Sequence, residues 1–483
     1  MKKLFIFILL MAHSICWSTD ISNKNYLSKP TGEYGIAFRD FHWINQNLCP
    51  DPMFTGKNGS DYSQNNPQHC REIIARVYYP SLTNKTSQYY HPFIAAQKEI
   101  LTQIPEITKH EIAQLNQLQS YSYANARPIT DKIFPVILFS PGYGCSIQTY
   151  ENFITELVSH GYIVIGINSP FISGDIELPN KHIIKTSPQM NINEILKNIL
   201  PIQAGDFSFI LKQIYKEHAD NLIFSAMDLK HIAAFGHSLG ALVVDNFVQT
   251  HPKWLQAAVT LDVGGNSTIK KANLPIMDVV SASFIRMVPV EIELGSDGYE
   301  VGLTPSSNNY HYSFHMNLSD RSTLQYLPAY RKVADYLAKI VKAGCDIKFL
   351  SHEPTKEEIS AFDKTTYVLI EKDKKWILSY YEAQTKIDDL DTSMIKNLDI
   401  ELNKLPPVPP EQLTEAEKEP IKQIVKYIFI YNHTQLGNGN GWKITNSINT
   451  YLVQFFNMYL KGKENLALKT CNSLTDDTLI RCG

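Results

Sequence analysis

The stretch IAAFGHSLGALVVDNFV, residues 232–248, decides the fold predicted for this chain. It begins with four residues suited to a buried strand and ends, at 241–248, in a helix-like apolar pattern. Between them lies Gly-x-Ser-x-Gly, with Ser238 at its centre. Strand, tight turn and helix in this order are the context in which the pattern forms a nucleophile elbow, whereas an isolated Gly-x-Ser-x-Gly also fits an ordinary turn. We therefore predict that Ser238 is a nucleophile, and that the strained turn needs a small residue on either side.

Strands and helices alternate on both sides of the elbow. Further strands are expected at residues 76–80, 135–140, 162–167, 257–261 and 275–280. Helices are expected near residues 150–160 and 204–217. The continuous apolar runs are typical of strands buried on both faces. This alternation predicts an α/β fold with a mostly parallel central sheet covered by helices.

The last third of the chain has a different pattern. Apolar runs at residues 367–370 and 376–381 flank a charged tetrapeptide and predict a hairpin, which a proline-rich spacer follows at 405–410. Thr414 and Glu417 have the spacing of a capping box for a helix that runs to about residue 429. A final helix has an apolar face made of Ile448, Leu452, Phe455 and Tyr459.

Composition indicates a globular protein. Of the 483 residues, 44% are apolar and 19% are charged, and the length suits one large domain with insertions or two domains. The formal net charge is −3 and no long basic run occurs, so we expect no nucleic-acid partner. Because neither a Cys-x-x-Cys motif nor a histidine-rich cluster is present, we expect no bound metal.

The N-terminal segment is typical of an export signal. Lys2 and Lys3 precede a short apolar run at residues 4–12, and small residues at 14–18 suit cleavage. The run is too short to span a bilayer as a helix. We therefore expect residues 1–18 to be a signal peptide and the mature protein to be secreted or periplasmic, with a retained N-terminal anchor as the alternative.

Cleavage near residue 18 leaves an even number of cysteines. These are Cys49, Cys70, Cys145, Cys345, Cys471 and Cys482. An even number in an exported chain is compatible with disulfides, and the pairs closest in sequence are Cys49–Cys70 and Cys471–Cys482. Cys145–Cys345 follows only by elimination, and two free buried thiols are an equal alternative.

A serine nucleophile needs a base and an acid, which in elbow-type hydrolases follow the serine in the order acid, then histidine. Asp262 comes at the carboxyl end of the strand after the elbow helix, where active-site groups collect, whereas its rival Asp278 lies inside a strand. His311 and His315 share one later loop and are equal candidates by spacing alone. His237 adjoins the nucleophile, but we expect its side chain to point elsewhere and to serve packing.

Several stretches besides the elbow match a known pattern. They are residues 139–144 (FSPGYG), similar to F-S-H-G-L-G; 159–164 (SHGYIV), similar to S-H-G-F-I-V; 257–262 (AAVTLD); 315–320 (HMNLSD), similar to H-Q-N-F-A-D; and 449–456 (NTYLVQFF) with 459–462 (YLKG). Together they resemble the platelet-activating-factor acetylhydrolase family of the α/β-hydrolase superfamily, which comprises plasma and intracellular type II enzymes and bacterial relatives. The resemblance covers residues 31–320 and the last helix.

The resemblance implies an α/β-hydrolase fold and a serine carboxylic-ester hydrolase. It favours His315 over His311 as the base and supports Asp262 as the acid that orients it. It also implies that the backbone N–H groups of Leu239 and Tyr143 bind the oxyanion. No cofactor is implied.

The implied substrate is a phospholipid with a short or oxidised sn-2 acyl chain, which makes the predicted enzyme similar to a phospholipase A2. Such a substrate implies transient contact with a membrane or lipid surface, and no obligate protein partner is expected. A broad-specificity secreted carboxylesterase or polyesterase would share every motif. A hydrolase fold used only for binding is a further alternative, against which the intact Ser238, Asp262 and His315 argue.

The family pattern has two departures. Pro141 replaces its histidine beside the oxyanion loop, and the region after Arg321 resembles nothing in the family until the closing helix. We therefore expect a hydrolase core at residues 19–322, an α+β insertion at 323–441 that serves as a lid or docking element, and a closing helix with a tail at 442–483.

Overall fold

The computed structural model gives positions for the larger part of the chain. The structure describes residues 27–53, 66–82, 88–89, 107–186, 195–262, 274–281, 298–303, 320–324, 332, 346–350, 355, 367–372, 375–380, 400–401, 403–406, 408, 412–422, 440–475 and 478–482. The predicted signal peptide, residues 1–18, lies outside these ranges.

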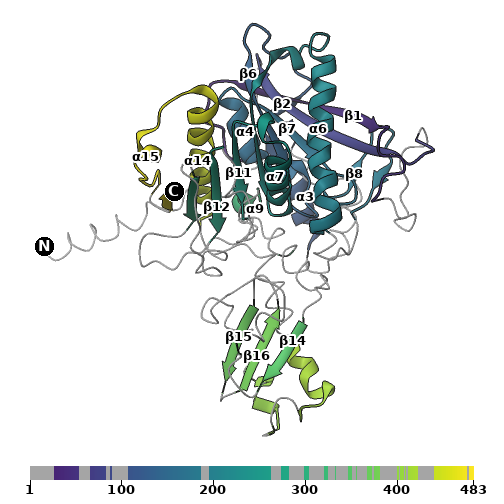
Figure 1. Cartoon of the computed structure of the whole chain (residues 1–483), viewed down its shortest axis with the longest axis vertical. Coiled ribbons are helices and arrows are strands. Elements are labelled where there is room, and N and C mark those ends of the chain that lie inside the picture. The colour runs from purple at the N-terminus through teal and green to yellow at the C-terminus, as the bar shows by residue number, and fades with distance from the viewer. Residues whose placement is uncertain are drawn as a thin grey trace, which may run out of the picture.

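A ten-stranded sheet forms the centre of the described residues (Figure 1). Its strands are β1 (Gly35–Asn45), β2 (Arg71–Ser81), β5 (Ser122–Ala124), β6 (Phe134–Ser140), β7 (Ile163–Asn168), β10 (Met227–His237), β11 (Ala257–Leu261), β12 (Ile276–Ser281), β13 (Gly298–Leu303) and β17 (Leu479–Cys482). They lie in the order β17-β13-β12-β11-β10-β6-β7-β2-β1-β5. All neighbours from β13 to β7 run parallel, and antiparallel pairs occur only toward the edges, at β17/β13, β7/β2 and β2/β1. The predicted mostly parallel sheet is confirmed.

Each central strand is buried on both faces because its alternate side chains enter two different cores. In β6, Val136 and Leu138 belong to one cluster of buried residues, whereas Ile137 and Phe139 belong to the other. Every residue of this strand is buried. This explains why the sequence shows a continuous apolar run here instead of alternation.

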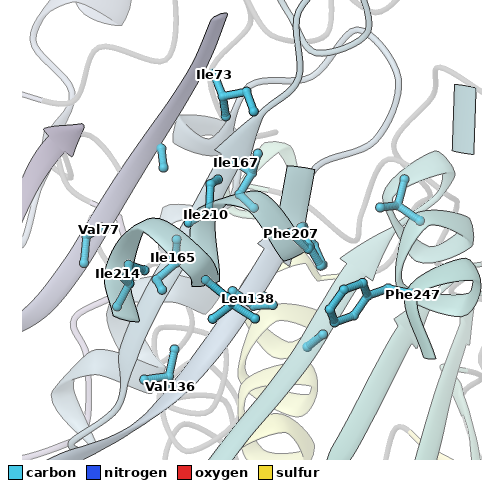
Figure 2. Packing of buried hydrophobic residues seen from close by; sticks show 14 of the residues in the cluster. Ile73, Val77, Val136, Leu138, Ile165, Ile167, Phe207, Ile210, Ile214 and Phe247 are labelled. Carbon is cyan, nitrogen blue, oxygen red and sulfur yellow. The ribbon is translucent and has the colours of Figure 1, made fainter. Parts of the chain in front are cut away.

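Helices cover both faces of the sheet, as predicted. On one face α6 (Leu200–Glu217) and α7 (Leu239–Thr250) pack against β2, β6 and β7, and Figure 2 shows Phe207, Ile210 and Ile214 of α6 facing these strands. On the other face lie α4 (Glu151–Ser159) and α14 (Gly441–Lys461). The sheet therefore lies between two helical layers.

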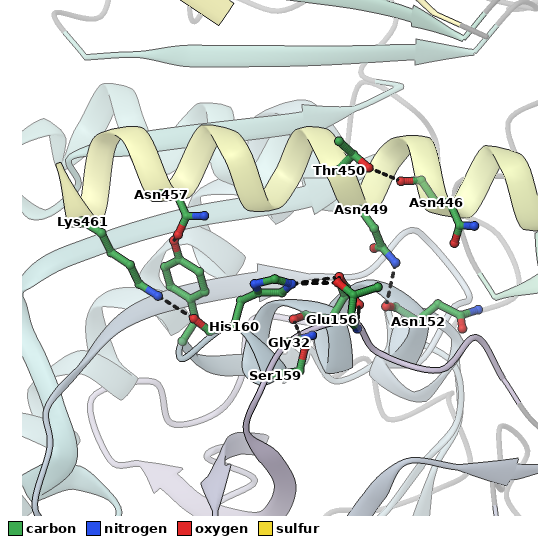
Figure 3. Close-up of polar contacts among 12 residues, drawn as sticks. Gly32, Asn152, Glu156, Ser159, His160, Asn446, Asn449, Thr450, Asn457 and Lys461 are labelled. Atoms are coloured by element: carbon green, nitrogen blue, oxygen red, sulfur yellow. Dashed lines mark hydrogen bonds and ion pairs between the residues drawn. The ribbon is translucent and has the colours of Figure 1, made fainter. Parts of the chain in front are cut away.

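The closing helix α14 completes the second layer. Its predicted apolar residues Ile448, Leu452 and Phe455 are fully buried, and Tyr459 packs against the same core. Polar contacts join it to the α4 region (Figure 3): Lys461 Nζ donates to the carbonyl of His160 (2.6 Å), and Asn449 donates to that of Asn152 (3.4 Å). The two residues of each pair are separated by 297 and 301 positions, so α14 packs against elements from the first half of the chain.

A second, three-stranded sheet lies in the predicted insertion, at the lower end of Figure 1. Its strands are β14 (Asp346–Leu350), β15 (Tyr367–Lys372) and β16 (Lys375–Tyr380). The antiparallel pair β15/β16 confirms the predicted hairpin. The capping box is confirmed as well, since the Thr414 N–H donates to Glu417 (2.7 Å) and the Glu417 N–H to Thr414 Oγ1 (3.4 Å).

The two disulfides predicted from short spacing are present. Cys49 is bonded to Cys70, and Cys471 to Cys482. Cys145 is a free, buried thiol, which agrees with the alternative to its pairing with Cys345; Cys345 itself lies outside the described residues.

No helix among the described residues is both long enough and apolar enough to cross a membrane.

A buried ionic cluster ties β2 to α6. Arg71 is fully buried and forms a bidentate salt bridge with Asp206 (Nε–Oδ1 2.8 Å, Nη2–Oδ2 2.7 Å). Its Nη1 donates to Asp51 Oδ2 at 2.9 Å. The Ser169 hydroxyl also donates to Asp206 (3.2 Å). Charges removed from water need such complete pairing, and loss of one partner leaves the others uncompensated.

We expect Asp206→Asn to lower the free energy of unfolding by about 3 kcal/mol, because Arg71 loses its two-pronged carboxylate in a buried site. The matched control is Asp40→Asn, which weakens a two-pronged pair with Arg76 of the same geometry (2.7 and 2.8 Å) at a half-exposed carboxylate. That loss should stay below about 1 kcal/mol. Urea unfolding of both variants measures the difference, and equal losses would contradict the role given to burial.

Candidate active site

Ser238 occupies a sharp turn between β10 and α7. Its backbone has φ 54° and ψ −121°, a conformation that residues other than glycine rarely adopt. The Ser238 N–H donates to the carbonyl of Leu261 (2.9 Å), which fixes the turn to the end of the neighbouring strand. The residue is partly exposed, whereas both neighbours in sequence are buried. This is the strained, accessible serine that the elbow pattern predicts.

The two glycines of the elbow are required by close backbone approach. A Cβ atom on Gly240 would overlap the carbonyl of Ser140 at the end of β6, and one on Gly236 would overlap the carbonyl of Gly240. Backbone atoms cannot move aside as a flexible side chain can. The prediction that small residues must flank Ser238 is therefore confirmed.

Asp262 lies directly after β11, at the same edge of the sheet as Ser238. It is buried, it has a positive φ of 51°, and its N–H donates to the carbonyl of Val279 (2.8 Å). Its carboxylate accepts two bonds from Ser281, one from the N–H (2.5 Å) and one from the hydroxyl (2.6 Å). Ser281, the last residue of β12, therefore holds both carboxylate oxygens.

Ser281 is not among the residues predicted from the sequence. The available signal was its place at the carboxyl end of the strand that follows Asp262.

Asp278, the rival acid, lies within β12. Its partner in the neighbouring strand β11 is Thr260, which precedes Asp262 by two residues. Its carboxylate accepts a bond from the Thr260 hydroxyl (2.9 Å). Asp262 is the one of the two that leaves the sheet at its carboxyl edge, although the choice between them stays a prediction.

The predicted base His315 and its rival His311 lie outside the described residues. The last residue of the predicted histidine segment, Asp320, is described and fully buried. Its carboxylate accepts the N–H groups of Glu151 and Asn152 (both 2.8 Å) at the start of α4, and its own N–H donates to Thr149 (2.8 Å). A carboxylate at a helix N-terminus satisfies unpaired N–H groups and complements the helix dipole. Asp320 itself is thereby fixed at the start of α4.

The loop from Pro141 to Cys145 lies against the elbow. A methyl group placed on Gly142 would be 3.3 Å from Ser238 Cβ. The loop is held by bonds from the Gly144 N–H to Ile172 (2.8 Å) and from the Cys145 N–H to Gly142 (3.0 Å). Tyr143, one predicted oxyanion donor, lies between these anchors, and the residue is 38% exposed.

The other predicted oxyanion donor, Leu239, is the first residue of α7. The N–H groups of a first helical turn have no partner within the helix and point toward any anion at that end. The shared role of Leu239 and Tyr143 stays a prediction.

His237 is buried, which fits the expected role in packing. It is 1% exposed, and its Nδ1 lies 2.7 Å from the Tyr150 hydroxyl.

We expect Gly240→Ala to lower the free energy of unfolding by about 3 kcal/mol or more, because its methyl group would meet backbone atoms. Gly205→Ala is the matched control: this glycine also lies in a helix, but nothing lies within 4 Å of the added carbon. That change should be neutral or stabilise by up to about 1 kcal/mol through helix propensity. Thermal melting measures both, and a Gly240→Ala variant as stable as the wild type would refute the tight contact.

Comparisons with known proteins concern the fold and one segment of the chain. The model of the family described as "Platelet-activating factor acetylhydrolase, isoform II" matches residues 51–169, a segment that includes β2, β6, α4 and β7 and the loop with Tyr143. No curated protein matches the chain. Among solved structures, a ferulic acid esterase from Streptomyces cinnamoneus has a TM-score of 0.56 and 15% identity, covering 95% of this chain and 99% of that chain.

At this identity the likeness to the esterase concerns the fold alone. The family match supports an ester hydrolase, which acts on an ester substrate. The resemblance found in the sequence is thus confirmed over residues 51–169, where the chain has the sequence pattern of the platelet-activating factor acetylhydrolase, isoform II, family within an α/β-hydrolase fold.

Proposed function

We propose that the chain is an exported serine ester hydrolase that cleaves acyl esters of phospholipids, with a preference for short or oxidised sn-2 chains. The observation that carries this proposal is the strained, partly exposed Ser238 at the sheet edge where the buried Asp262 follows the neighbouring strand. The family match over residues 51–169 supports the class of reaction and favours the phospholipid substrate.

The proposed reaction is acyl transfer through Ser238. The serine oxygen attacks the ester carbonyl carbon while His315 takes the hydroxyl proton. The tetrahedral intermediate then releases the lysophospholipid, whose alkoxide oxygen receives that proton from His315. A water molecule, deprotonated by His315, attacks the acyl-enzyme, and the carboxylic acid leaves as the proton returns to Ser238.

Asp262 and two backbone N–H groups stabilise the charges that form during this reaction. The carboxylate of Asp262 orients His315 and stabilises its imidazolium form, and burial strengthens the attraction because little water screens it. Both of its oxygens are fixed by Ser281, so little reorganisation is needed. The N–H groups of Leu239 and Tyr143 bind the oxyanion, and removal of one such donor costs about 3 to 4 kcal/mol in comparable enzymes.

The domain organisation forms part of the proposal. Residues 1–18 direct export, 19–322 form the hydrolase core, 323–441 are an insertion that acts as a lid or docking element, and 442–483 close the core. The two disulfides are compatible with an oxidising compartment. A phospholipid substrate requires transient contact with a lipid surface, for which the insertion with its separate sheet is suited.

We expect the mature chain to release short or oxidised sn-2 acyl groups, and Ser238→Ala to abolish the release. The measurement is hydrolysis of phospholipids whose sn-2 groups range from acetyl to palmitoyl. Serine-dependent release of long chains would instead indicate a general phospholipase.

Two outcomes of this assay would contradict the phospholipid proposal. Cleavage of simple esters without phospholipid turnover would identify a broad-specificity carboxylesterase or polyesterase. No turnover of any ester and no labelling by a fluorophosphonate would identify a binding protein, and labelling that survives Ser238→Ala would exclude this serine as the nucleophile.

We expect His315→Ala and Asp262→Asn each to lower kcat by about 10³-fold or more, because they remove the base and the group that orients it. The matched controls are His311→Ala in the same loop and Asp278→Asn on the adjacent strand, which should stay within about threefold of the wild type in an assay governed by the triad. Steady-state kinetics on one soluble short-chain ester measures all four. A larger loss in either control than in its partner would reverse that assignment.

A further inference from the structure

The hydroxyl of Tyr150 lies between the nucleophile elbow and the loop that carries Tyr143. Tyr150 ends the short helix η2 (Ile147–Tyr150) and is fully buried. Its oxygen accepts the N–H of Gly142 (3.1 Å) and lies 2.7 Å from Nδ1 of His237. One hydroxyl thus bonds both the residue before the nucleophile and the loop beside it.

The contact among these groups leaves no spare room. A methyl group on Gly142 would lie 3.2 Å from the Tyr150 oxygen, 3.2 Å from His237 Nδ1 and 3.3 Å from Ser238 Cβ. The Tyr150 ring packs edge-on against Phe139, with centroids 4.9 Å apart. Its backbone is held on both sides, because Thr149 and Glu151 each bond to Asp320. The side chain of Tyr150 is therefore held in one position by its packing.

The hydrogen bond from the Gly142 N–H to the Tyr150 hydroxyl restrains a residue whose backbone would otherwise rotate freely. Glycine has the widest choice of backbone angles, so Gly142 needs external bonds to hold one conformation. Its N–H is held by Tyr150, and its carbonyl accepts the Cys145 N–H (3.0 Å). The peptide bond from Gly142 to Tyr143 is planar and trans, so a fixed carbonyl fixes the opposite direction of the Tyr143 N–H.

We infer that Tyr150 is a positioning residue, whose hydroxyl joins His237 to Gly142 and so aims the Tyr143 N–H before the oxyanion forms. The inference rests on the proposed function, in which that N–H binds the oxyanion. Donors held in place in advance stabilise the transition state without reorganisation during the reaction. In this view His237 acts on catalysis only through Tyr150.

The test is Tyr150→Phe, which removes one oxygen and keeps the ring. We expect kcat on p-nitrophenyl acetate to fall by about 10- to 100-fold while KM changes less than about threefold, as befits a loss confined to the transition state. The matched control is Tyr78→Phe: this tyrosine is equally buried in the same core, but its hydroxyl donates to Glu151 (2.9 Å). Equal losses of kcat in the two variants would overturn the inference, because they would reflect general packing.

A second measurement needs no substrate. Hydrogen exchange of a peptide covering residues 141–146 should be faster in Tyr150→Phe than in the wild type and in Tyr78→Phe. Faster exchange together with a lower kcat in Tyr150→Phe supports the inference. If ester cleavage by the wild type depends on Ser238 and Tyr150→Phe has an unchanged kcat, the inference is overturned. Faster exchange in a protein that cleaves no ester would refute the proposed function while supporting the bridge itself.

Discussion

The contact between the start of α7 and the end of β6 governs the arrangement around Ser238. Gly240 lies so close to the carbonyl of Ser140 that no side chain fits between them. The helix therefore begins directly over the point where β6 gives way to the loop that contains Gly142. The proposed nucleophile, the N-terminus of α7 and the loop with Tyr143 are brought together by this approach, which depends on the absence of side chains at Gly236 and Gly240.

Buried carboxylates fix the surroundings of this contact. Asp262 is held through both oxygens by Ser281, and Asp320 caps the start of α4. Each carboxylate is paired with N–H or O–H donors, which is what makes burial of a charge tolerable. Asp262 joins the end of β11 to the end of β12, and Asp320 is joined to the start of α4, next to Tyr150.

Local patterns in the sequence predicted the elements well, but not their edges or their mutual bonds. β10 is longer than its apolar core, because Met227 and Asp228 also pair with β6 and a register shift separates them from Ile232. α6 begins at Leu200, before the expected start, where Pro201 suits the first turn of a helix.

Other features depend on contacts that no local pattern reports. The edge strand β17 pairs with β13, whose residues lie 177 to 183 positions earlier (Gly302 opposite Leu479, Tyr299 opposite Cys482), so neither short run shows its partner. The roles of Ser281 and Tyr150 arise only when separate strands and turns meet. The turn at Ser238 could be predicted because a motif marks it, and motifs also mark Asp262 and the loop with Tyr143 as candidates. The groups that hold them are ordinary serine and tyrosine residues.

The position of α14 has a consequence for the order in which the protein can mature. The face of the sheet that contains Ile137 and Phe139 is covered in part by a helix that begins at residue 441, more than 200 positions after Ser238. A ribosome thus completes Ser238, Asp262 and residues 323–440 while this apolar face still lacks part of its cover. The core on this face can pack completely only after the C-terminal helix has been synthesised, and until then its exposed apolar surface favours aggregation or binding to chaperones.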